Sequence, residues 1–233
     1  MPRNISHSFI SHNVYHSSCA FGGEVTLVNI IIYFYEFCCA VFPAIFVLIV
    51  LCAYQKRHQI GMTFSIPVIA VFTVYLAAVL HFTGAGTLHD AIRFGIDFNP
   101  SQINLIPFNG FEHDIEGHIL NILLFMPLGI ILPLSVQSTH KAWVAVVFAA
   151  IFSIAIELSQ FMNSRVTDID DVMMNILGAF LGYITYCILT KVIKRELKGS
   201  VPLNVVIILT CSVCLGRFLF YDEFGLAKIL FGF

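Results

Sequence analysis

Long apolar runs alternate with short polar connections along most of this chain. Six runs approach the roughly 20 residues that an α-helix needs to cross the hydrocarbon core of a bilayer. They lie at about 26–53, 62–82, 118–136, 142–162, 171–190 and 203–220. This pattern predicts an all-α, polytopic membrane helix bundle with about six transmembrane helices, and it indicates neither internal repeats nor a separate soluble domain.

The composition agrees with a membrane setting. Hydrophobic residues make up 58% of the 233 residues and charged residues only 11%, against roughly 25% charged residues in soluble domains. We therefore expect membrane lipids as partners. The net charge of −2 does not favour a nucleic-acid partner. The polar tail at 1–24 lacks the charged start and short apolar core of a signal peptide, so we expect no cleaved signal.

Basic residues predict the orientation of the helices. Cytoplasmic connections of membrane proteins are enriched in lysine and arginine. Seven of the 12 basic residues fall in alternate connections, at Lys56, Arg57, Lys141, Lys191, Lys194, Arg195 and Lys198. The connections around 83–117 and 163–170 are instead acidic. We therefore expect these acidic loops and both termini to lie outside the cell.

Two neighbouring apolar runs carry polar residues at helical spacing. In the sequence TDIDDVMMNILGAFLGY, one stripe contains Asp168, Asp171, Asn175, Gly178 and Gly182; in the preceding run, a second stripe contains Ser153, Glu157, Gln160 and Ser164. Ionisable side chains are costly inside a membrane, so such residues indicate a functional site. The short connection between the runs contains Arg165, which is able to form directional hydrogen bonds with nearby carboxylates.

The two glycines predict close helix packing. Small residues four positions apart allow a neighbouring helix to approach the backbone. Because the connection is short, we expect the helix at 142–162 to be the antiparallel neighbour, with the two polar stripes facing each other. His81, His118 and Asn121 lie at the same expected depth. The candidate ligand-binding residues are Asn121, Glu157, Gln160, Arg165, Asp168, Asp171 and Asn175, with Gly178 and Gly182 as helix-packing residues.

Other polar residues leave several chemical roles open. Glu157 and Asp171 would serve as an acid and a base if burial separated their pKa values. The segment from Glu112 to His118 contains oxygen and imidazole groups suited to a divalent ion, but its spacing matches no metal motif. We therefore expect no metal or cofactor and assign no catalytic residue. Glu36, near the middle of the first run, is protonated or internally hydrogen-bonded, paired, or part of a conduction path.

Four motifs in order resemble the VanZ-like family. These are NLIPF at 104–108, NILLFMPLG at 121–129, IELSQ at 156–160, and DIDDVMMNILGAFLGY at 168–183, preceded by Arg165. The resemblance covers about 104–190. Leu120 stands where the family pattern has glycine. The resemblance implies a multi-pass protein of the bacterial plasma membrane that is associated with resistance to glycopeptides such as teicoplanin.

The resemblance also divides the chain. We expect a polar tail at 1–24, two helices and an outer loop at 25–100, the VanZ-like core at 101–190, and a basic loop with the last helix and tail at 191–233. The leading functional hypothesis is cell-envelope protection by binding a cell-wall precursor, a lipid or a glycopeptide. The alternatives are a membrane enzyme that modifies a lipid-linked or peptidoglycan substrate, and a proton-linked transporter. The sequence does not indicate the oligomeric state.

Overall fold

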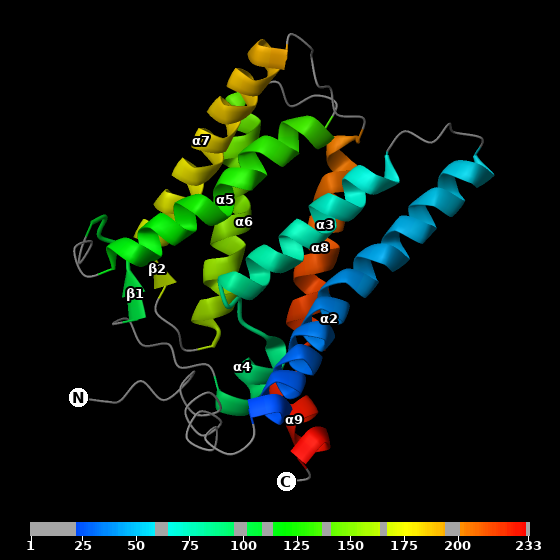
Figure 1. The fold of residues 1–233 in the computed structure, drawn as a ribbon, viewed down its shortest axis with the longest axis vertical. Helices are drawn as coiled ribbons and strands as arrows, with labels where there is room; N and C mark the ends of the chain where they lie inside the picture. The colour runs from blue at the N-terminus through cyan, green and yellow to red at the C-terminus, as the bar shows by residue number, and fades with distance from the viewer. Residues whose placement is uncertain are drawn as a thin grey trace.

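The protein is described here by a computed structural model, which covers residues 22–58, 65–95, 102–108, 114–136, 141–163, 167–193 and 201–231. These residues form eight helices and one pair of very short strands (Figure 1). In chain order the elements are α2 (Gly22–Arg57), α3 (Ile66–Phe82), α4 (Leu88–Phe94), β1 (Ile103–Asn104), α5 (Ile115–Ser135), α6 (Ala142–Phe161), β2 (Thr167–Asp168), α7 (Ile169–Ile193), α8 (Leu203–Phe220) and α9 (Glu223–Phe231).

The long helices have the length and composition of membrane spans. Within the described ranges, α2, α5, α6, α7 and α8 are long and apolar enough to cross a bilayer, while α3 has 17 residues. Large apolar side chains such as Phe46, Ile151 and Val192 are exposed on the outside of the bundle, as expected for surfaces that contact lipid. The predicted all-α membrane helix bundle is therefore confirmed, and a total of six spans stays a prediction.

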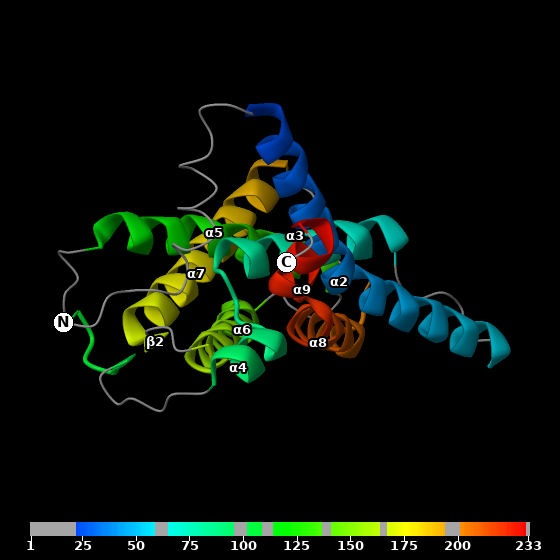
Figure 2. The same cartoon turned by 90° about the horizontal axis from the view of Figure 1, so that it is seen from below.

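The helices form two groups that meet in a common core. Helix α2 packs mainly on α8, and α3 contacts both, whereas α7 packs on α5 and α6. Figure 2 looks nearly along α6 and α8 and shows the other long helices inclined to them. Contacts of α3 with α5 join the two groups. The core there contains the fully buried side chains of Phe72, Leu76, Phe125, Leu128, Leu132 and Leu209.

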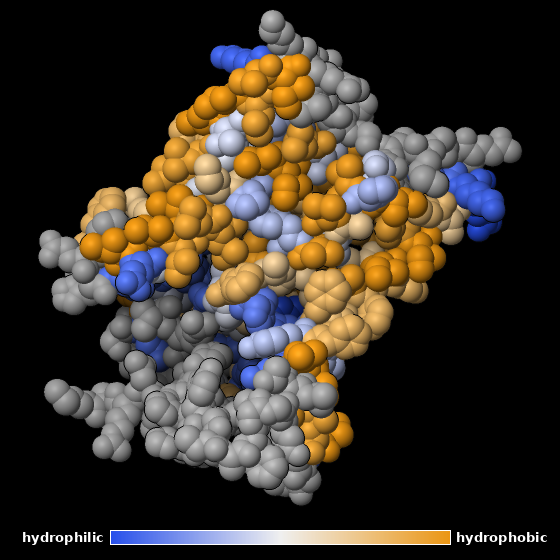
Figure 3. All heavy atoms as spheres, in the orientation of Figure 1, coloured by the Kyte–Doolittle hydropathy of each residue, from blue (hydrophilic) through white to orange (hydrophobic). Residues whose placement is uncertain are grey.

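The two ends of the bundle differ in character. The basic last turns of α2 and α7, with Lys56, Arg57 and Lys191, lie toward the upper end in Figure 1. The short elements α4, α9, β1 and β2 lie toward the opposite end. Figure 3 shows apolar residues over most of the described part of this face and hydrophilic residues in a hollow of its lower half. The grouping of basic residues at one end agrees with the expected orientation. That the opposite end faces the outside of the cell stays a prediction.

The glycine face of α7 lies against α5. A Cβ atom added at Gly178 or Gly182 would overlap the main-chain carbonyl oxygen of Ile122 or Met126, and one added at Gly129 of α5 would overlap that of Ala179. We expected this face to close on the helix at 142–162, which is α6. The structure differs because α5 contributes a small residue of its own, so that the backbones of α5 and α7 approach from both sides.

Candidate functional site

Helices α5 and α7 bring together an amide, a carboxylate and an imidazole close to their first turns. The Asn121 Nδ2 donates a hydrogen bond of 2.6 Å to Asp171 Oδ1. The Nδ1 atom of His118 lies 3.9 Å from the same oxygen. His118 is buried, whereas 36% of the Asp171 side chain remains exposed. Asp171 is therefore the acidic group in this cluster that a ligand is able to reach.

The NLIPF segment pairs with the start of α7. Strands β1 and β2 are parallel, with Ile103 opposite Thr167 and Asn104 opposite Asp168. Asn104 Nδ2 donates to both carboxylate oxygens of Asp168, at 3.1 and 3.0 Å. Asp168 Oδ1 also accepts a hydrogen bond of 2.9 Å from the main-chain N–H of Asp170. Asn104, which the sequence marked only as a family position, thus fixes one of the predicted site residues.

Asp170 is a structural acid that the sequence analysis missed. Its side chain is only 1% exposed, and both of its oxygens accept the main-chain N–H of Phe108, at 2.8 and 3.0 Å. Phe108 has a φ of 62°, a left-handed conformation that is uncommon for a residue with a side chain. We infer that Asp170 holds the end of the NLIPF segment in this conformation. The sequence signal for this structural role of Asp170 was its position at a helix N-terminus, where carboxylates are favoured.

The other predicted site residues that the structure describes lie at two places, one where α6 meets β2 and α7 and one at the connection from α3 to α4. Glu157 is buried, and its Oε2 atom accepts the main-chain N–H of Asp168 at 3.2 Å. Asn175 Nδ2 donates to Ser153 Oγ at 2.9 Å between α7 and α6. Gln160 instead donates from Nε2 to the main-chain oxygen of Thr83, at 2.6 Å, and so braces the connection from α3 to α4. Arg165 and the expected contact of its guanidinium group lie outside the described residues.

A second polar cluster joins α2, α3 and α8. Arg217 Nε donates to Glu36 Oε1 at 2.7 Å, and His81 Nδ1 lies 2.6 Å from Glu36 Oε2. A nitrogen of the same guanidinium group also donates to the main-chain oxygen of Ala85. Glu36 and Arg217 are both buried. Of the roles left open for Glu36, the structure therefore gives the paired one; its partner Arg217 was missed, although a lone arginine in an apolar helix was a signal.

Comparison with known proteins places the chain in a family. The family model described as VanZ/LLP1 matches residues 68–190, just over half of the chain. This chain belongs to the VanZ/LLP1 family. The resemblance inferred from the four motifs is thereby confirmed. No curated protein and no solved structure matches the chain.

The VanZ/LLP1 region contains the whole cluster around Asp171. It extends from α3 through β1, α5, α6 and β2 to near the end of α7. Helices α2, α8 and α9 lie outside it. The Glu36–Arg217 ion pair therefore connects two helices that flank the VanZ/LLP1 region, and His81 links this pair to the region itself.

An ion pair also joins α4 of this VanZ/LLP1 chain to the connection before α9. Arg93 of α4 donates to Asp222 at 3.1 Å, and the main-chain N–H of Gly225 donates to the same carboxylate at 2.9 Å. Partial burial opposes ionisation of Asp222, but the Gly225 N–H and the Arg93 guanidinium outweigh it and lower the pKa of Asp222. This contact helps to attach α9 to α4.

A metal centre is not seen in the part of this VanZ/LLP1 chain that the structure describes. Within those residues, no group of three or more histidine, cysteine, aspartate or glutamate side chains is placed to hold a metal ion. Glu112 and His113, two of the residues considered for a divalent ion, lie outside the described ranges. The described geometry is that of a hydrogen-bonded acidic site.

Proposed function

We propose that this VanZ/LLP1 protein resides in the bacterial plasma membrane, with its acidic loops outside, and protects the cell envelope by binding a ligand at Asp171. The ligand class is a peptide-bearing cell-wall precursor or a glycopeptide antibiotic. The observation that carries the proposal is the partly exposed Asp171 carboxylate, which accepts a hydrogen bond from Asn121 and lies beside buried, hydrogen-bonded residues. The family membership supports the same compartment.

The charge around Asp171 defines what the site is suited to bind. The carboxylates of Asp168 and Asp114 add negative charge, and His118 is the nearby base. A desolvated acidic site favours ligand groups that donate hydrogen bonds, above all those with positive charge. Peptide stems and glycopeptides both present amide N–H and ammonium groups. We therefore expect a donor-rich part of the ligand to contact Asp171.

Binding fits the contacts better than the acid–base alternative does. Glu157, the proposed partner of Asp171 in proton transfer, is buried, and its carboxylate accepts the main-chain N–H of Asp168. A general acid or base must come within hydrogen-bonding reach of the substrate. Glu157 is positioned to brace β2, whereas Asp171 is positioned to meet a ligand. The ion pair of Glu36 with Arg217 likewise supports a fixed scaffold over a proton-linked transporter.

The test compares nearly isosteric variants in cells. Asp171→Asn removes the exposed charge, and Asp222→Asn removes a carboxylate in the loop before α9, outside the site. Bacteria that lack a protein of this family would express each variant, with membrane levels matched by immunoblot, and the minimal inhibitory concentration of teicoplanin would be measured. We expect wild type and Asp222→Asn to protect the cells and Asp171→Asn to fail.

A biochemical measurement identifies the ligand. Mass spectrometry of molecules that co-purify with the wild-type protein should reveal a peptide-bearing cell-wall precursor that Asp171→Asn does not retain. Glu157→Gln should lose both the ligand and thermal stability, because the amide is a weaker acceptor for the N–H of Asp168. Wild-type protection by Asp171→Asn at equal expression would refute the site. Absence of protection by the wild type itself would remove the resistance role from this chain.

A further inference from the structure

A short loop after β1 carries large apolar side chains on its outside. This apolar loop consists of residues 105–108. Leu105 and Ile106 are 67% and 66% exposed, and Phe108 is 58% exposed. Pro107 between them is exposed as well. Contiguous exposed apolar residues of this kind mark a surface that meets a membrane or another molecule.

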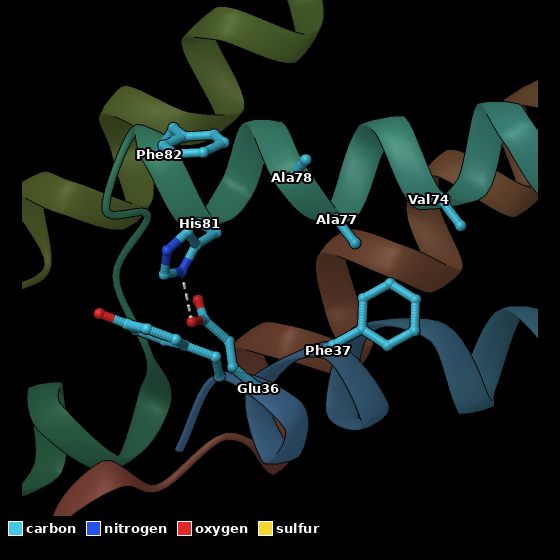
Figure 4. A pocket seen from close by; sticks show the side chains of 8 residues that line it. Glu36, Phe37, Val74, Ala77, Ala78, His81 and Phe82 are labelled. Carbon is cyan, nitrogen blue, oxygen red and sulfur yellow. Dashed lines mark hydrogen bonds and ion pairs between the residues drawn. The ribbon is translucent and has the colours of Figure 1, made fainter. Parts of the chain in front are cut away.

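The apolar surfaces of the helices have a simpler cause. The pocket between α2 and α3 is one of them, with the exposed residues Phe37, Val74 and Phe82 in its walls (Figure 4). The outer faces of helices in a membrane bundle contact acyl chains, so apolar residues are expected there. The apolar loop follows β1 and belongs to no helix. Its composition therefore needs a cause of its own.

The main chain of the apolar loop is suited to a poorly hydrated place. The Ile106 N–H donates to Asn104 Oδ1 at 3.3 Å. The Phe108 N–H donates to both oxygens of the buried Asp170. Pro107 has no N–H to satisfy. At three of the four positions, the loop thus avoids the unpaired N–H group that makes irregular backbone costly among lipids.

The apolar loop is fixed to the first turn of α7. Before the loop, β1 pairs with β2, and Asn104 donates to both oxygens of Asp168; at its end, Asp170 holds Phe108. Helix α7 has 25 residues and the composition of a membrane span. At 1.5 Å per residue it is about 37 Å long, which exceeds the roughly 30 Å of the hydrocarbon core. Its first turn, and the loop bonded to it, therefore lie at the level of the lipid headgroups.

A lipid surface fits the apolar loop better than a protein partner does. A stable protein contact buries about 800 Å² on each partner, with roughly 20–30 residues a side. Four loop residues by themselves supply only a small part of such a surface. The boundary between headgroups and acyl chains demands less, because a few apolar side chains are enough to enter it.

We propose that the apolar loop at 105–108 inserts into the headgroup–acyl boundary of the bilayer, at the end of the bundle where α4 and α9 lie (Figure 1). Its three large side chains contact the first part of the surrounding acyl chains. Asp170 is a positioning residue, because it holds the loop and does not touch lipid. Asp170 and Asp171 are consecutive, so insertion also fixes the depth of Asp171. The inference does not depend on the function proposed for Asp171.

The experiment uses tryptophan fluorescence as a depth probe in the full chain. The sequence has one tryptophan, Trp143, so Trp143→Phe removes the background signal. Ile106→Trp is added, and the protein is placed in phosphatidylcholine nanodiscs, whose two faces are both open to the buffer. The quenchers are spin-labelled phosphatidylcholines, with the nitroxide on the headgroup or near the carbonyl or methyl end of an acyl chain. Iodide in the buffer reports contact with water.

The expected depth of the probe at 106 is about 5–10 Å into the boundary. The label near the carbonyl end should therefore quench it most, and iodide should quench it weakly. Ile151→Trp, at an exposed position of α6, is the control and should be quenched most by the label near the methyl end. Adding Leu105→Asp should lift the probe at 106 toward water and increase quenching by iodide. Leu105→Val keeps an apolar side chain and should leave the depth unchanged.

Three results would overturn the proposal, and each needs only Ile106→Trp to fold, which exchanges one exposed apolar side chain for another. Iodide quenching as strong as that of free tryptophan, with no effect of the lipid labels, would place the loop in water. Strongest quenching by the label near the methyl end would place it in the hydrocarbon core. Protection from iodide and from every lipid label would mean that protein covers the loop. Thermal melts establish that each variant is folded.

Discussion

The close contact of α5 with α7 offers a sharp test of how packing and the site are linked. At Gly178, even an added methyl group would overlap the carbonyl oxygen of Ile122 in α5. In Gly178→Ala, the two backbones must therefore separate by on the order of 1 Å to regain ordinary van der Waals distances. Overpacking of this kind typically costs about 1–3 kcal/mol. We expect the unfolding free energy of Gly178→Ala in detergent to fall by that amount.

The same displacement should reach the candidate site. Asn121 immediately precedes Ile122, and its side chain donates to Asp171 at 2.6 Å. A separation of about 1 Å would stretch this contact to roughly 3.6 Å, which is beyond hydrogen-bonding distance. Gly178→Ala should therefore weaken protection of cells in the same direction as Asp171→Asn does. Gly182→Ala should act similarly, and the double variant should cost less than the two single costs added, because both relieve their overlap by moving the same helix.

The assay is thermal unfolding of purified protein in a fixed detergent, followed by circular dichroism. Leu181→Ala is the matched control, because Leu181 lies between the two glycines in sequence but is exposed. It should change stability much less than Gly178→Ala does. A melting curve for Gly178→Ala that coincides with that of wild type would refute the close packing of α5 on α7. Strictly additive costs in the double variant would refute the common displacement.

Three other features of the molecule give measurable outcomes. In a background without native cysteines, Gly110→Cys should react with an impermeant thiol reagent on intact cells and Glu196→Cys should not; labelling at 196 alone contradicts the orientation. Arg217→Met leaves Glu36 buried without its arginine, so the unfolding free energy should fall by about 3–5 kcal/mol, and the added change Glu36→Gln should restore part of it; no recovery would argue against the ion pair. The folded pKa of Asp222 is lowered, so its stabilisation of α9 is present above about pH 4 and is lost as the pH falls through the folded pKa. Hydrogen exchange in α9 should accelerate in that range, and an identical acceleration in Asp222→Asn would contradict this cause.

The sequence by itself determined the long helices and the family, and the sidedness that it predicts stays a prediction. Apolar run length and 3.6-residue spacing are local properties, so they predicted α5, α6, α7 and α8 closely. The same spacing placed Asp171, Asn175 and Gly178 on one stripe. Motif order alone identified the VanZ/LLP1 family, since it needs no knowledge of which helices touch.

Only the tertiary structure decided which faces meet. A glycine stripe is able to receive any neighbouring helix, and the short connection favoured α6, yet α5 makes the close contact because Gly129 gives it a small face of its own. The partner of Glu36 is 181 residues away in sequence, at Arg217, and no local pattern encodes a pairing over that distance. The structural role of Asp170 likewise depends on a distant segment, because its carboxylate accepts the main-chain N–H of Phe108 at the end of the NLIPF segment. Helix formation depends on neighbours in the chain, whereas these pairings depend on how separate helices share limited space and satisfy each buried polar group.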